Sequence, residues 1–134
     1  ALNDVLEIDP EPCACGSVFR VIKTIHGRAD DIFYLQGAGG DIRYLFPDYV
    51  RRAINQASDA IREYQAIQHA MDEIEIRLLL EPDADRASIQ QTIRDNLAWR
   101  IRAVGGQMVQ VRFSEQPPER NPRSLKLIRV VRQF

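Results

Sequence analysis

The sequence predicts an α+β fold in which two helices cover one face of an antiparallel sheet. Two patterns indicate this class. The segment 73–81, "EIEIRLLLE", alternates apolar and charged residues, as a half-buried antiparallel strand does. The segment 86–104 instead repeats apolar residues at helical spacing, which predicts a helix with one buried face. The chain has 134 residues, with 45% hydrophobic and 28% charged residues, which is typical of one soluble globular domain.

The N-terminal third predicts turns followed by three short strands. Residues 1–16 contain the turn sequences "DPEP" and "CACG" and are expected to be an approach segment. The run 18–25, rich in β-branched residues, predicts a strand. Two more strands, 31–36 and 41–46, flank "GAGG", whose glycines supply the positive φ that a tight hairpin requires.

The rest of the chain alternates between helices and strands. Pro47 opens a predicted helix over 47–58, because proline is tolerated in the first helical turn. Asp85 is the expected N-cap of the helix over 86–104. Three further strands are expected, at 60–68, 107–113 and 125–131. The resulting β-α-β-β-α-β unit, preceded by a β-hairpin, resembles a ferredoxin-like sandwich.

Charge and hydropathy exclude several classes of partner. The net charge is −1 and the isoelectric point is near 6.2, so no strong attraction to nucleic acid or to an anionic membrane is expected. No apolar run approaches the roughly 18 residues of a membrane span. The acidic start, "ALNDVLEIDPEP", does not show the basic-then-apolar pattern that is typical of a signal peptide. We therefore expect a cytoplasmic protein with no nucleic-acid or membrane partner.

The two cysteines, Cys13 and Cys15, are separated by one residue in "CACG". A structural zinc usually takes four ligands, and cysteines this close would form a strained disulfide. We therefore expect two reduced thiols in a tight turn and no bound metal. The alternative is a metal site that is completed by His26 or His69.

Residue types and spacing alone reveal no catalytic motif. The sequence has no Ser/His/Asp set and no phosphate loop of the Walker spacing. Four arginines near the C-terminus could bind phosphate or an acidic substrate, or could form a solvated face. They are Arg120, Arg123, Arg129 and Arg132.

The segment "CACGSVFRVIKTIHGRADDIFYLQ" resembles the region that joins the two domains of adenylate-forming ligases. It is most similar to the phenylacetate–CoA ligase-like branch, which includes synthetases that adenylylate a deazaflavin coenzyme. That branch has Cys-x-Cys-Gly, a strand, Gly-Arg-x-Asp-Asp, a hairpin and a helix begun by proline. Later it has a strand of the "EYQAIQ" kind and a lysine near the C-terminus. The resemblance covers nearly the whole chain.

The resemblance implies that residues 1–26 are the tail and linker of a large N-terminal adenylation domain, and that residues 27–134 are a small C-terminal lid. The whole enzyme would use ATP and Mg²⁺ to activate a carboxylic acid as an acyl-AMP. It would then transfer the acyl group to coenzyme A or to another acceptor. The implied partners are the large domain, the acid and coenzyme A, with a homodimer left open. The fragment alone should be inactive.

Five residues match functional positions of this family. Asp4 matches the aspartate that holds the ribose hydroxyls, Arg28 the arginine that approaches the nucleotide, and Arg43 the basic residue after the hairpin turn; these three are the implied cofactor-binding residues. Asp30 matches the hinge about which the lid turns. Lys126 matches the catalytic lysine that reaches the reacting carboxylate and the α-phosphate. The alternatives are an exposed acid at Asp4, a local salt bridge at a strand edge for Arg28 and Asp30, and an ordinary strand lysine at 126.

The segment around Lys126 departs from the family at one position. The family has glycine before the lysine, whereas this chain has Leu125. A bulky residue there is expected to stiffen the loop and to change how Lys126 is presented.

Two other classes of function remain open at this stage. The chain could be a free-standing ferredoxin-like module that binds a small ligand or dimerises, because fold alone says little about function. It could also be a structural domain whose open strand edge pairs with a partner chain.

Overall fold

The computed structural model describes residues 4–28 and 31–134. For residues 27 and 28 it describes the backbone alone. Asp30, the predicted hinge, lies outside the described residues. The elements are β1 (Asp4–Ile8), β2 (Ile22–Arg28), β3 (Phe33–Gln36), β4 (Ile42–Leu45), α1 (Pro47–Asn55), β5 (Ile61–Ala70), β6 (Glu73–Leu80), α2 (Arg86–Ala103), β7 (Gln110–Ser114) and β8 (Val130–Arg132). In the described part of the chain, no helix is both long and apolar enough to span a membrane.

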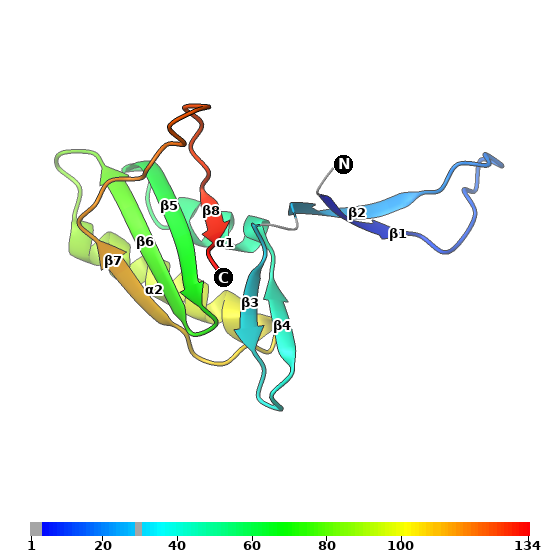
Figure 1. Ribbon diagram of the computed structural model, residues 1–134, viewed down its shortest axis with the longest axis horizontal. Coiled ribbons are helices and arrows are strands. Elements are labelled where there is room, and N and C mark those ends of the chain that lie inside the picture. The colour runs from blue at the N-terminus through cyan, green and yellow to red at the C-terminus, as the bar shows by residue number, and fades with distance from the viewer. Residues whose placement is uncertain (1–3, 29–30) are drawn as a thin grey trace.

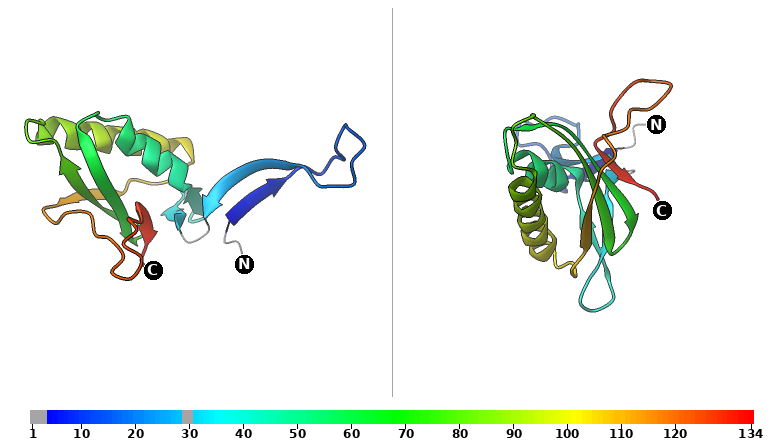
Figure 2. Two further views of the ribbon diagram at one scale, coloured as in Figure 1. Left: turned by 90° about the horizontal axis from the view of Figure 1, so that it is seen from above. Right: turned by 90° about the vertical axis from the view of Figure 1, so that its left-hand side faces the viewer.

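Four strands form the central sheet in the order β7-β6-β5-β8, and both helices pack on one of its faces (Figures 1 and 2). The α+β class with two helices is therefore confirmed. The sheet is mixed rather than antiparallel throughout, because β7 pairs with β6, and β8 with β5, in the parallel sense. The chain passes from β6 to β7 through α2, and a helical crossover of this kind allows parallel pairing.

Helix α2 buries the stripe that its sequence predicts. The buried residues recur every four positions and are Ile89, Ile93, Leu97 and Ile101. The helix begins at the predicted cap, where Asp85 Oδ1 accepts a hydrogen bond of 3.1 Å from the backbone N–H of Ser88. Inward-facing residues of β5 and β6 complete the same core from the sheet side, and they include Tyr64, Ala66, Ile74, Ile76 and Leu78.

The predicted hairpin is present as β3 and β4, which pair antiparallel and lead directly into α1 at Pro47. Gln68, a fully buried residue of β5, holds this hairpin against the central sheet. Its side-chain oxygen accepts a hydrogen bond of 3.0 Å from the N–H of Tyr34, and its amide group donates one of 2.6 Å to the C=O of Tyr34. One side chain therefore satisfies both backbone groups of Tyr34 and positions the start of α1.

β1 and β2 form a two-stranded arm that projects away from the rest of the chain (Figure 1). Within the predicted approach segment 1–16, residues 4–8 form a strand that was not predicted, and this strand pairs with β2 along its length. The strand predicted at 18–25 begins instead at Ile22, because residues 9–21 form the loop at the end of the arm. At the base of the arm, the ring of His26 stacks on Phe46, with 4.5 Å between ring centroids.

Candidate functional site

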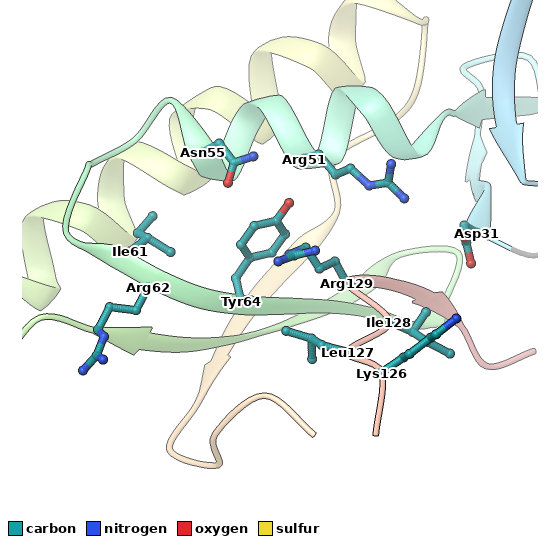
Figure 3. Close-up of a pocket in the computed structure, with 10 residues that line it drawn as sticks. All are labelled: Asp31, Arg51, Asn55, Ile61, Arg62, Tyr64, Lys126, Leu127, Ile128 and Arg129. Carbon is teal, nitrogen blue, oxygen red and sulfur yellow. The ribbon is translucent and has the colours of Figure 1, made fainter. Parts of the chain in front are cut away.

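A cleft of about 510 Å³ lies between α1, β5 and residues 126–129, which lead into β8 (Figure 3). Its lining is rich in charged and polar side chains, among them Asp31, Arg51, Asn55, Tyr64, Lys126 and Arg129. The cleft exists because β8 pairs with β5, with Val130 opposite Ala66. This pairing brings the segment before β8 alongside the part of β5 that carries Tyr64.

The cleft carries an excess of positive charge. Within residues 4–28 and 31–134, no carboxylate forms an ion pair with Lys126 or Arg129. Arg51 has only a distant contact with an acid, 3.9 Å from Asp48. Arg62 differs, because its side chain points away from the cleft (Figure 3) and lies 3.5 Å from Glu81. Arg51, Lys126 and Arg129 therefore line one cleft in which Asp31 is the one carboxylate among the described lining residues.

Tyr64 forms the floor of this cleft and is only 3% exposed. Burial raises the pKa of its phenol, although Arg129, Arg51 and a hydrogen bond with Asn55 act in the opposite direction. The hydroxyl points between Asn55 and Arg51 in Figure 3. The Arg129 guanidinium lies 5.8 Å from the centroid of the Tyr64 ring. The hydroxyl therefore stays protonated at neutral pH and is able to donate a hydrogen bond.

Lys126 stands on a turn and not within a strand, because β8 begins only at Val130. Asn121 holds this turn from both ends. Its backbone N–H donates to the C=O of Lys126 at 2.9 Å, and its C=O accepts from the N–H of Leu125 at 2.8 Å. Its side-chain oxygen also accepts from the N–H groups of Arg123 and Ser124, at 2.9 and 3.0 Å. The backbone is therefore ordered, while the Lys126 side chain is exposed at the rim of the cleft.

Leu125 adopts a left-handed backbone conformation with φ of 55°. This region costs an L-residue roughly 1–2 kcal/mol and is the region that glycine occupies readily. The leucine side chain is 70% exposed, so no core packing holds it there. The position before Lys126 thus has the backbone shape that a glycine would favour, although the residue is leucine.

Two other predicted residues with described side chains, Asp4 and Arg43, do not line the cleft. Asp4 is exposed on β1, and its Cα lies opposite that of Arg28 on β2, so the arm brings these two predicted positions together. Arg43 lies on β4, with its Nε 2.8 Å from Asp41. Of the three predicted residues whose side chains the structure describes, Asp4, Arg43 and Lys126, only Lys126 lines the cleft.

Sequence reasoning did not single out Arg51, Asn55 or Tyr64. Nothing in their spacing connects them with the C-terminal segment, because the strand pairing that joins the two is long-range. Arg129 was one of four arginines considered for anion binding, and it is the one that lines the cleft. Two of the others make contacts elsewhere: Arg120 pairs with Glu63, and Arg132 donates a hydrogen bond to the C=O of Ile32, which lies just before β3.

The two cysteines lie in the loop at the end of the arm, with 2.8 Å between their Sγ atoms. A hydrogen bond with Cys13 lowers the pKa of the Cys15 thiol. His26 and His69 each lie beside a glutamate instead. Among the described side chains, no three His, Cys, Asp or Glu residues come together as metal ligands, so a site completed by either histidine is not assembled there.

No protein-family profile and no curated protein matches the sequence. The fold does match solved structures, and these belong to the class of adenylate-forming ligases. One is 2-hydroxyisobutyryl-CoA ligase in the postadenylation state in complex with 2-HIB-AMP, with a TM-score of 0.53 and 22% identity over 98% of this chain. A second structure of that ligase, in complex with R3-HIB-AMP, has a TM-score of 0.52 and 23% identity over the same share. The chain spans 28% of the ligase chain, and at this identity the likeness concerns the fold alone.

Proposed function

We propose that the chain is the small C-terminal lid domain of an ATP-dependent carboxylate ligase that works through an acyl-AMP intermediate. One observation carries the proposal beyond the shared fold. Lys126 is exposed on an ordered turn at the rim of a basic cleft, where it is able to face another domain. The finer assignment, to the phenylacetate–CoA ligase-like branch, is supported by the motifs "CACG" and "GRADD" in their order along the chain.

The division into residues 1–26 and 27–134 is part of the same proposal. The arm exposes apolar side chains that a solitary domain would bury, with Val18 95% and Phe19 81% exposed. Leu6, Ile8, Ile22 and Ile25 are also exposed. A surface of this kind suits packing against the large N-terminal domain of the same protein, which would hold most of the ATP and the carboxylic acid.

In the adenylation step, the substrate carboxylate attacks the α-phosphorus of ATP and pyrophosphate leaves. Negative charge gathers on the phosphoryl oxygens during attack, and the Lys126 ammonium would stabilise it. Cationic groups suit the phosphate oxygens of ATP, but the described residues offer no carboxylate cluster for Mg²⁺. The magnesium ion would therefore be bound by the large domain. The acyl group would then pass to the thiol of coenzyme A or to another acceptor, with release of AMP.

The remaining predicted residues would serve the nucleotide and the movement of the lid. Asp4 and Arg28, which face each other across the arm, would lie close to the ribose and phosphates. Asp30 would be the hinge, where a few residues absorb the change in backbone angles. Arg43 would be a further basic contact to the nucleotide.

The test is acid-dependent ATP–pyrophosphate exchange by the full-length enzyme. We expect Lys126→Ala to reduce exchange by about 10² or more, because the stabilising charge is lost from the transition state. Arg123→Ala is the matched control, since Arg123 is an exposed cation on the same turn. Its exchange should stay close to the parent value. Unchanged exchange in a folded Lys126→Ala protein would remove Lys126 from the mechanism.

A further inference from the structure

We propose that the cleft beneath Lys126 is a binding site for a phosphate group, held by Arg51 and Arg129 with the Tyr64 hydroxyl between them. Lys126 is the one residue at this cleft that the family resemblance singles out, whereas Arg51, Tyr64 and Arg129 have no part in that resemblance. Only the source of the phosphate rests on the proposed function.

The first argument is convergence. Arg51 comes from α1, whereas Lys126 and Arg129 come from the segment before β8. The Arg129 guanidinium lies 5.8 Å from the centroid of the Tyr64 ring, and the positive charges of both arginines act against the rise in the phenol pKa that burial causes. Figure 3 shows Arg51 extending from α1 and Arg129 extending toward the Tyr64 ring, while Lys126 extends toward Asp31 at the other end of the cleft. Arginine forks and a hydroxyl donor are the groups that bind phosphate oxygens most effectively.

The second argument is that these charges are left uncompensated. Positive charges that share a cleft repel one another, and a nearby carboxylate would normally offset this repulsion. In the described part of the chain, Arg129 and Lys126 have no carboxylate within 4.0 Å, and Arg51 has one only at 3.9 Å. Asp31 is the one carboxylate of the described cleft lining, and it also has an interaction of its own. A bound phosphate dianion would supply the negative charge that these three cationic side chains lack.

The third argument is size. A cleft of about 510 Å³ exceeds the volume of a single phosphate and lies within the usual range for small-molecule sites. In the proposed ligase, two species could supply the phosphate. One is the pyrophosphate that leaves during adenylation, and the other is the 3′-phosphate of coenzyme A. Both present the same chemistry, a phosphate dianion, to the two arginines.

The experiment titrates this 134-residue chain with pyrophosphate and, separately, with adenosine 3′,5′-bisphosphate, followed by amide NMR shifts at constant ionic strength. We expect saturable shifts in α1 and in residues 124–130. Stronger binding of pyrophosphate would assign the site to the leaving group, and stronger binding of the bisphosphate would assign it to the acceptor. Failure of both to saturate below about 10 mM, which corresponds to negligible affinity, would overturn the proposal.

Single-residue variants distinguish binding at this specific site from non-specific electrostatic attraction of anions. Arg51→Gln and Arg129→Gln should each weaken binding by about tenfold or more, because each removes a charge-assisted hydrogen bond. Tyr64→Phe keeps the ring in the core and should weaken binding by about threefold. Arg62→Gln is the matched control, because Arg62 lines the same cleft but faces Glu81, and binding should change by less than about twofold. Equal losses in all four variants would contradict the site.

The outcome can be told apart from that of the ligase proposal. Anion binding to this chain needs no large domain and no reaction. Binding that persists while Lys126→Ala keeps full exchange would reject the ligase mechanism and retain the cleft. Loss of exchange in Lys126→Ala, together with no anion binding, would retain the ligase mechanism and reject the phosphate site.

Discussion

The arm and the body of this chain both contain many apolar residues, but they differ in how far they bury these side chains. The body, residues 31–134, buries most of its large apolar side chains in one core between two helices and a sheet. The arm, β1 with β2 and the loop between them, leaves most of its apolar side chains in solvent. Apolar surface on a two-stranded arm has nothing within the arm to pack against, because an isolated hairpin has no second layer. The difference indicates that the body is stabilised by its own packing and that the arm is suited to packing against another surface.

The sharpest way to break this comparison is to truncate one large side chain in each region. Leu97→Ala should lower the free energy of unfolding by about 2–5 kcal/mol, because it opens a cavity in a fully packed core. Phe19→Ala should change it by less than about 0.5 kcal/mol, because the ring is already in water. Chemical denaturation of the 134-residue chain measures both values. Similar losses in the two variants would show that the arm is part of the same cooperative unit.

A second variant tests how the body holds its outer hairpin. Gln68→Ala should cost about 1–3 kcal/mol, because the N–H and C=O of Tyr34 lose their partners in a buried place. Gln91→Ala is the control, since that glutamine is exposed on α2 and bonds only to a neighbouring side chain. Thermal unfolding of the two variants should separate them clearly. A loss confined to Gln91→Ala would contradict the role given to Gln68.

The smallest effect concerns the pH dependence of two glutamates. Burial alone would raise the pKa of Glu75, but hydrogen bonds and charge from Arg77 and His69 outweigh it, and the pKa is lowered from 4.5. A lowered folded pKa stabilises the fold above the unfolded value, and this stability is lost as pH falls through the folded pKa.

Glu75→Gln should therefore be less stable than the parent at pH 7, and the gap should narrow below about pH 4.5. Glu7 also has a lowered pKa, first through its hydrogen bond with Lys23, but this pair is open to solvent on the arm, with the Lys23 and Glu7 side chains 60% and 43% exposed. We expect Glu7→Gln to leave the pH profile almost unchanged, because solvent screens exposed pairs. Denaturation curves between pH 3 and pH 7 compare the two variants.

Much of the body could be predicted from sequence because its elements carry strong local periodicity. β6 and α2 were predicted within about one residue at each end, since one alternates with period two and the other repeats at helical spacing. β1 was missed because five residues next to turn sequences give little periodic signal. The predicted strand over 125–131 shrank to three residues because Asn121 bonds to the backbone of this segment and makes it a turn.

The candidate site was likewise predicted only in part from the sequence. The sequence alone determined the helices and most strands of the body, which faces of α2 and β6 are buried, and that Lys126 is a residue to test. Tertiary structure decided that the outer strands are parallel, that Lys126 stands on a turn, and that Arg51, Tyr64 and Arg129 share one cleft. The physical reason is how far apart along the sequence the interacting residues lie. Periodicity, caps and turns act between residues a few positions apart, whereas the pairing of β8 with β5 joins segments that no local pattern connects.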